Sequence, residues 1–349
     1  MRIALLAPGE ESVPPSKYGG TELIVSNLAE TLVARGHEVY LLASGDSQTK
    51  AKLVPVFFES IRKYPGAQNP LERETMKFMG LGRTIIELQK LKVDIVHNHI
   101  GWRYLPFASL YKAPTVTTLH GPLDVKYQQL VYGTYKDAAY VSISNSQREP
   151  FPDLNFAATV YNGIEVEKFE FEEKPGEYLA FLGRMSPEKG PIDAIKIAKA
   201  AGKKLIMAAK VDSVDVEYFT KKVKPLIDGK QIKFIGEVDH VGKVKLLKNA
   251  LGLIAPINWR EPFGLFLVEA MACGTPVLTR PMGAAPELIL NEKTGFVYRT
   301  NRELIAAVKH LGSISRTACR KRVEDFFSAK RMTEGYEMVY RSLLERKSS

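Results

Sequence analysis

The sequence is poor in cysteine. It contains only two, Cys273 and Cys319, among 349 residues. Two cysteines cannot build a disulfide framework, and they do not make a zinc site. Disulfide-stapled secreted proteins and Cys-ligated zinc modules are therefore excluded, and the composition agrees with a reducing, cytoplasmic compartment. We expect Cys273 to be a small buried residue.

Long apolar runs are also absent. No stretch of eighteen apolar residues occurs, so the sequence predicts no transmembrane helix. Residues 1–8 are too short for a signal peptide and are expected to form a first strand. With 45% hydrophobic and 25% charged residues, the composition is that of a globular protein. The length suits two domains of about 170 residues, each large enough to bury its own core.

Two functional motifs are missing. The first loop, residues 8–20, lacks the G-x-G-x-x-G pattern, which disfavours a dinucleotide-dependent dehydrogenase. No two aspartates are separated by a single residue, the pattern common in metal-dependent sugar transferases, so we expect no metal and no cofactor. His97 and His99 lack the matching Cys, Asp or Glu of a metal site, and we expect both to be satisfied structural residues.

The positive charge is distributed unevenly. The net charge is +10, which indicates anionic partners. Up to Glu165 the chain has 17 Lys and Arg against 16 Asp and Glu, whereas residues 166–349 have 32 against 23. The second half is therefore the basic one. No nucleic-acid-binding module is recognisable, so we expect no nucleic-acid partner.

Hydrophobic periodicity predicts two α/β domains with parallel sheets. A strand, a helix over 21–35 and a second strand over 38–43 form a βαβ opening, and a second such set begins at 178. The expected domains are residues 1–165 and 166–329, followed by a last helix within 330–349. Polar clusters follow several strands, including His120-Gly121, and these should line the carboxyl edge of the first sheet.

Residues 251–279 show a strand, turn, helix and strand pattern. We expect a strand over 251–257 and a helix over 263–272, whose first turn offers unpaired N–H groups to an anion. Glu261, just before the helix, and Glu269 are eight residues apart, about two turns, which would place both acids on the same side of the helix. They could bind the hydroxyls of a sugar and a ribose, or they could simply complement the positive helix end.

Cations and glycines follow other strands at similar positions. Arg184 and Lys189, in a Gly-Arg-x4-Lys-Gly pattern, converge after the strand that begins at 178, where they suit a diphosphate. Either residue alone would be a solvated loop charge. Gly19 and Gly20 precede the first helix and either let a phosphate approach the backbone or form a flexible turn. Lys210 ends a further predicted strand and is an additional phosphate candidate.

The stretch from Glu261 to Val277, EPFGLFLVEAMACGTPV, resembles the E-x7-E signature of the retaining glycosyltransferases of family 4. The resemblance implies a GT-B enzyme: two doubly wound Rossmann-like domains facing across a cleft, with the C-terminal helix crossing back to the N-terminal domain. It also implies an N-terminal acceptor domain and a C-terminal domain that binds the nucleotide sugar. The Ala-Ala-Lys-Val-Asp turn over 208–212 resembles a bacterial subgroup that includes UDP-glucose:tetrahydrobiopterin glucosyltransferase.

The resemblance also implies roles for individual residues. It makes His120, Arg184, Lys189 and Glu261 the expected catalytic residues. The expected donor-binding residues are Gly19, Gly20, Lys210, Phe263, Gly264, Leu265 and Glu269. His120 would lie near the donor sugar, and attack would occur on the face from which the diphosphate departs.

The expected reaction is metal-independent transfer from a nucleoside diphosphate sugar, with UDP-glucose as the first choice and UDP-GlcNAc or GDP-mannose next. The acceptor would be a hydroxyl of a small molecule, glycan or lipid-linked compound. Membrane association stays open, but the nearly neutral N-terminal half does not favour it. Two rivals remain: a sugar-nucleotide epimerase or hydrolase on the same scaffold, and a sugar-nucleotide-binding protein without catalysis.

Overall fold

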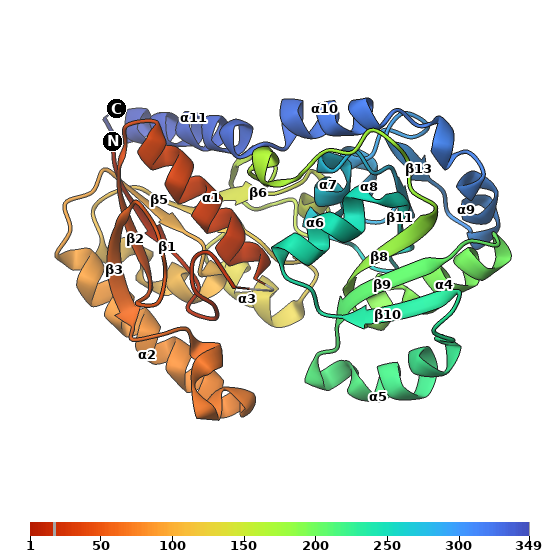
Figure 1. Cartoon of the computed structure of the whole chain (residues 1–349). Coiled ribbons are helices and arrows are strands. Elements are labelled where there is room, and N and C mark those ends of the chain that lie inside the picture. The colour runs from red at the N-terminus through yellow and green to blue at the C-terminus, as the bar shows by residue number, and fades with distance from the viewer. Residues whose placement is uncertain (17–18, 349) are drawn as a thin grey trace. The chain divides into compact units, whose positions relative to one another are not determined.

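Two parallel β-sheets organise the structure, a computed structural model that describes residues 1–16 and 19–348 (Figure 1). The chain divides into two compact units. Unit 1 contains the chain up to Ile164 and again from Ala329, and unit 2 contains Glu165–Ser328. Each unit has its own sheet with helices between most successive strands, so the expected pair of doubly wound α/β folds is confirmed.

The sheet of unit 1 has seven strands in the order β3-β2-β1-β4-β5-β6-β7, and all recorded pairings are parallel. Its strands are β1 (Arg2–Leu6), β2 (Glu38–Ser44), β3 (Lys52–Phe57), β4 (Ile95–Asn98), β5 (Thr115–Leu119), β6 (Ala139–Ser142) and β7 (Phe156–Thr159). Its α-helices are α1 (Gly20–Ala34), α2 (Pro70–Gln89), α3 (Lys126–Thr134) and α11 (Ala329–Ser348).

The sheet of unit 2 has six parallel strands in the order β10-β9-β8-β11-β12-β13. Its strands are β8 (Tyr178–Arg184), β9 (Leu205–Lys210), β10 (Ile232–Gly236), β11 (Ala250–Ala255), β12 (Val277–Thr279) and β13 (Gly295–Val297). Its α-helices are α4 (Pro191–Ala200), α5 (Val216–Tyr218), α6 (His240–Lys248), α7 (Leu265–Ala272), α8 (Ala285–Leu288), α9 (Asn301–Val308) and α10 (Arg316–Phe326).

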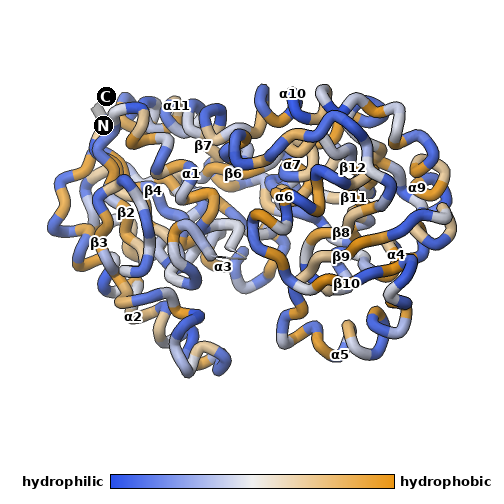
Figure 2. The backbone as a smooth tube through the Cα atoms, viewed as in Figure 1, coloured by the Kyte–Doolittle hydropathy of each residue, from blue (hydrophilic) through white to orange (hydrophobic). Residues whose placement is uncertain are grey.

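The hydrophobic residues that define the strands form the core of each unit. Ile3–Leu6 of β1 and Leu253–Ile254 of β11 are fully buried, as expected for strands covered on both faces. Figure 2 shows long hydrophobic stretches in the strands, whereas α10 is largely hydrophilic. Cys273 is buried and free, as predicted, and so is Cys319. Within the described residues, no helix has the length and apolar character needed to cross a bilayer.

The C-terminal helix α11 packs against α1 in unit 1 (Figure 1). Glu337 of α11 accepts two hydrogen bonds from Arg35, both 2.8 Å long, and lies 2.9 Å from Nε2 of His37. The hydrogen bonds from Arg35 and the lesser contribution of His37 outweigh the effect of burial and lower the pKa of Glu337 to about 2.

We predict that Glu337→Gln weakens the docking of α11 in a pH-dependent way. The pKa of Glu337 is lower in the folded protein than in the unfolded chain, where it is near 4.5, so the ionised carboxylate stabilises the fold at pH values above 4.5. This stabilisation is lost as the pH falls through about 2. The free energy of unfolding should therefore drop by about 2 kcal/mol at pH 7. The difference from the parent should shrink steadily below pH 5. Urea titrations from pH 7 to pH 3 measure it, with Glu334→Gln as the control on the same helix. An equal loss at every pH would contradict the prediction.

Candidate functional site

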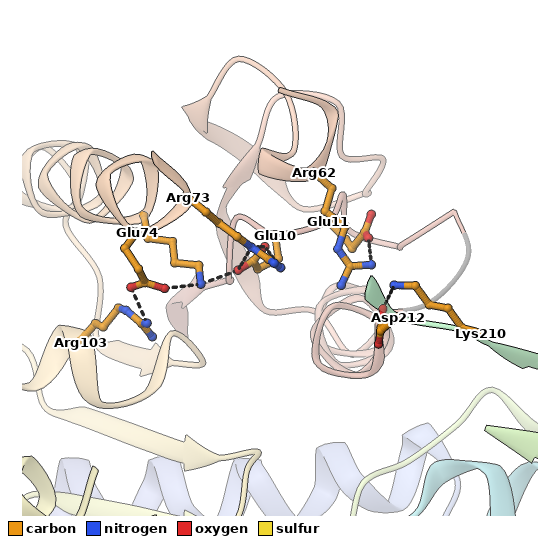
Figure 3. Close-up of polar contacts among 9 residues, drawn as sticks. Glu10, Glu11, Arg62, Arg73, Glu74, Arg103, Lys210 and Asp212 are labelled. Atoms are coloured by element: carbon orange, nitrogen blue, oxygen red, sulfur yellow. Dashed lines mark hydrogen bonds and ion pairs between the residues drawn. The ribbon is translucent and has the colours of Figure 1, made fainter. Parts of the chain in front are cut away.

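The carboxyl ends of β8 and β9 bring two predicted cations together in unit 2. Arg184 ends β8 and pairs in register with Lys210, which ends β9. Asp212 lies between them: its carboxylate is 2.7 Å from Nζ of Lys210 and 3.7 Å from the guanidinium of Arg184. Figure 3 shows the contact between Lys210 and Asp212. Arg184 also forms an ion pair with Glu188. The sequence predicted both cations but not the acids that hold them.

Lys189 and Glu261 form a buried ion pair. Lys189 ends the 3-10 turn Pro187–Lys189, and Glu261 follows β11; each is 8% exposed. The ammonium lies 4.8 Å from the ring centre of Phe266 and 5.3 Å from that of Trp259, within range for cation–π attraction. Nε1 of Trp259 donates a 3.1 Å hydrogen bond to Glu261. A cation and an acid that the sequence predicted as separate site residues are therefore joined in one ion pair.

Two glycines in left-handed conformations allow the surrounding loops to pack closely. A Cβ at Gly190 (φ 71°) would lie 2.2 Å from the carbonyl oxygen of Pro256. A Cβ at Gly283 (φ 58°) would lie 2.2 Å from the carbonyl oxygen of Glu261. Neither contact tolerates a side chain, so the loops after β8, β11 and β12 meet only because both residues are glycine.

The helix after Glu261 begins later than the sequence predicted. Gly264 takes a left-handed conformation (φ 95°), and α7 starts at Leu265 rather than Phe263. Glu261 lies in the turn before the helix, as predicted, but this turn extends to Gly264, so helical spacing does not apply between Glu261 and Glu269. Glu269 is on α7, 5% exposed, and forms an ion pair with Lys243 of α6. The two acids have separate lysine partners.

Arg280 also lies in the loops that follow β8, β11 and β12, but it was not identified as a site residue from the sequence. It follows β12, and its guanidinium contacts the side chains of Asn258, Asp193 and Asn301. Burial opposes ionisation of Asp193, but the hydrogen bonds from Arg280 and Asn301 outweigh it and lower the pKa of that carboxyl. The position of Arg280 directly after a strand was the signal that could have found it.

The Gly-Gly loop of unit 1 leads directly into α1. Gly20 is the first residue of the helix, and a Cβ at Gly19 would lie 2.7 Å from Cβ of Pro15. Residues 17–18 of this loop lie outside the described residues. Glu22, in the first turn of α1, is 5% exposed; burial, and to a lesser extent the neighbouring acids Glu11 and Glu10, raise its pKa to about 7. No sequence pattern had indicated that the pKa of this carboxyl would be raised.

A chain of charges lies beside that loop in unit 1. Glu10 accepts hydrogen bonds from Arg73 and pairs with Lys77 at 2.7 Å, and Lys77 also pairs with Glu74. Arg103 donates to Glu74 at 2.8 Å. Figure 3 shows these side chains from the loop after β1, from α2 and from the segment after β4 pointing toward one another. The network ties these three segments together.

Three histidines cluster at the ends of β4 and β5. His97 is satisfied, as predicted, because its nitrogens contact Tyr340 and Thr118, both at 2.7 Å. Nδ1 of His99 lies 2.8 Å from Nε2 of His120. The expectation that His99 is satisfied is only half right, since its buried Nε2 has no hydrogen-bond partner in the described residues. Burial lowers the pKa of His120 to about 4.

Gln147 fixes the backbone on both sides of His120. It is 2% exposed, and Nε2 donates 2.7 Å hydrogen bonds to the carbonyl oxygens of Leu119 and Gly121. Its Oε1 accepts a 2.8 Å hydrogen bond from the backbone N–H of Ile143. The sequence did not identify Gln147, because a glutamine after a strand carries no distinctive pattern.

Comparison with known proteins adds two family matches. Residues 18–168 match the model described as Glycosyltransferase Family 4, and residues 164–324 match Glycosyl transferases group 1. The glycogen synthase of Mycobacterium tuberculosis is 26% identical, covering 81% of this chain and 79% of the relative. The N-acetyl-alpha-D-glucosaminyl L-malate synthase of Bacillus anthracis is 24% identical over 93% and 94%.

A solved structure with a similar fold is that of the Anabaena protein HepE in complex with UDP and glucose. It superposes with a TM-score of 0.76 at 18% identity, covering 98% of this chain and all of that chain. At this identity the likeness shows the fold alone.

Proposed function

Since the chain is a GT-B glycosyltransferase of the group 1 and family 4-like kind, we propose that it transfers a sugar, with retention, from UDP-glucose to a hydroxyl acceptor. The observation that carries the proposal is the convergence of Arg184, Lys189 and Glu261 at the strand ends of unit 2. The choice of donor is supported by HepE, whose structure contains UDP and glucose, and by the resemblance to pterin glucosyltransferases.

The proposed chemistry requires charge stabilisation on the departing diphosphate. The bond between the sugar's anomeric carbon and the phosphate oxygen breaks while the acceptor oxygen bonds to that carbon on the same face. The acceptor's proton passes to the departing phosphate oxygen. Arg184 and Lys189 would stabilise the negative charge that develops, and Lys210 would add a third cation. The backbone at Gly264 and Leu265, where α7 begins, would offer N–H groups.

The remaining residues would orient the donor. Glu261 would accept hydrogen bonds from sugar hydroxyls, Phe263 would line the same turn, and Glu269 would hold the ribose. His120 would contact the sugar near the reacting carbon, and the backbone at Gly19 and Gly20 would approach the diphosphate. Because the sequence has no Asp-x-Asp pair, side chains rather than a metal ion would stabilise the charge on the diphosphate.

A ligand screen by thermal unfolding tests the donor. At 100 times its dissociation constant a specific ligand adds about 2.7 kcal/mol to the stability of the native state. We expect UDP and UDP-glucose to raise the melting temperature by several degrees, with GDP- and ADP-sugars giving much smaller shifts. Arg184→Ala serves as the control and should lose most of the shift. A shift with GDP-mannose alone would overturn the choice of donor.

Product analysis separates transfer from its rivals. With a library of hydroxyl acceptors, NMR of the glycosylated product should show the same anomeric configuration as the donor. An epimerase or hydrolase would consume the donor at the same rate without any acceptor. A binding protein would bind UDP-glucose and leave it intact. Either result would contradict transferase activity, and an inverted product would contradict retention alone.

A further inference from the structure

The buried imidazole of His99 and the partly buried imidazole of His120 share a single hydrogen bond in unit 1. Nδ1 of His99, which follows β4, lies 2.8 Å from Nε2 of His120, which follows β5. The ring centres are 5.1 Å apart with planes tilted by 31°. Gln147 holds the carbonyl groups on both sides of His120, so the backbone of that residue is fixed independently of His99. The hydrogen bond to His99 therefore determines which nitrogen of the His120 ring carries the proton, and not the backbone conformation of His120.

Both rings are neutral near pH 7. Burial lowers the pKa of His120 to about 4 and that of His99 well below its ordinary value, and the nearby His97 lowers the latter further. No acidic side chain is recorded in a hydrogen bond or ion pair with either ring among the described residues. In a bond between two neutral imidazoles, one nitrogen donates and the other accepts. The tautomer of each ring therefore depends on the other.

The surroundings of His99 decide which ring donates. Its second nitrogen, Nε2, is buried and has no partner in the described part of the chain. The neighbouring ring of His97 is 3.9 Å away, but both of its nitrogens are engaged by Tyr340 and Thr118. A buried N–H without an acceptor is rarer in proteins than a buried acceptor without a donor. His99 should therefore carry its proton on Nδ1 and leave Nε2 bare.

We propose that His99 is a positioning residue that donates from Nδ1 to Nε2 of His120 and thereby fixes His120 with its proton on Nδ1. His120 then offers a hydrogen-bond donor, not an acceptor, to an oxygen of the sugar donor. This consequence for the substrate rests on the proposed function, whereas the tautomer does not. Position 99 therefore requires a side chain that can donate a hydrogen bond to Nε2 of His120 from the place that Nδ1 occupies.

The tautomer is measured by two-bond ¹H–¹⁵N correlation spectra of protein labelled with ¹⁵N-histidine, using His120→Gln to assign the signal. Two variants of nearly equal size separate donation from packing. His99→Asn keeps an N–H near the position of Nδ1, whereas His99→Asp offers only carboxylate oxygens. Far-ultraviolet circular dichroism and melting temperatures monitor folding of both. Transfer is assayed over pH 5–9 with saturating donor and acceptor.

We expect the unmodified protein to show His120 protonated on Nδ1. His99→Asn should keep that pattern and at least a third of the parent's kcat. His99→Asp should move the proton to Nε2, raise the pKa of His120 and lower kcat at least tenfold. His120 protonated on Nε2 in the unmodified protein would overturn the proposal without the need for any variant, and so would equal kcat for the Asn and Asp variants. If the unmodified protein shows His120 protonated on Nδ1 but His120→Ala retains full transfer, the role of His120 in the proposed function would be overturned instead.

Discussion

Replacing Arg184 with alanine is expected to lower kcat about 100- to 1,000-fold, which corresponds to roughly 2.7–4 kcal/mol of transition-state stabilisation. The guanidinium stands at the end of β8, beside Lys210, where the proposed diphosphate would accumulate charge. Its side chain is 28% exposed, and its recorded ion pairs are with the partly exposed Glu188 and Asp212. Stability should therefore change by only about 0.5 kcal/mol.

Two further variants make this result specific. Arg184→Lys keeps the charge but not the paired N–H groups, so we expect a loss of kcat intermediate between parent and alanine variant. Lys199→Ala removes one positive charge from α4 in the same unit, at a side chain that is 41% exposed, and should leave transfer unchanged. Steady-state kinetics with UDP-glucose and urea unfolding of each variant supply the numbers. Full turnover by Arg184→Ala would remove this residue from the mechanism.

The two acids of the E-x7-E pattern are expected to respond differently to the same substitution. Glu261→Gln should lower kcat about 100-fold with little change in donor KM, because the proposed contact to the sugar hydroxyls strengthens as the anomeric carbon becomes positive. Glu269→Gln should raise the donor KM about tenfold with kcat nearly unchanged. A ribose contact is equally strong in the ground state and the transition state, so its loss affects only binding.

Each of the two variants serves as a control for the effect of the other on folding stability. Both acids are buried, and both neutralise a lysine, Lys189 for Glu261 and Lys243 for Glu269. Each carboxamide leaves one ammonium without its recorded countercharge, so the losses of folding stability should be similar. Urea unfolding establishes this before the kinetics are compared. If both variants lose kcat to the same extent, the separate roles assigned to sugar and ribose are wrong.

Much of the fold could be predicted because strands and their loops follow local patterns. β2 covers the strand predicted over 38–43 and one residue more, and β8 begins at 178, as predicted. The rule that ligands bind at the carboxyl ends of parallel strands selected Arg184, Lys210 and His120. Arg184 and Lys210 end β8 and β9, and His120 directly follows β5. The start of α7 was wrong because the left-handed conformation of Gly264 depends on its loop.

The contacts between side chains could not be predicted. Lys189 and Glu261 are 72 residues apart, and Gln147 reaches carbonyl groups 26 and 28 residues away. Such pairs depend on which strands are neighbours in the sheet. β11 lies beside β8 although two strands, β9 and β10, come between them in the chain. The shared bond of His99 and His120 likewise exists only because β4 and β5 are adjacent.

By itself the sequence determined that the chain forms two parallel α/β units and which charged residues follow their strands, because alternating apolar segments and turn residues act over a few positions. Only the tertiary structure decided which acid neutralises which lysine, where α7 begins, and that His120 is held by Gln147 and His99. Those features arise from distances between residues far apart in the chain, and packing alone sets such distances.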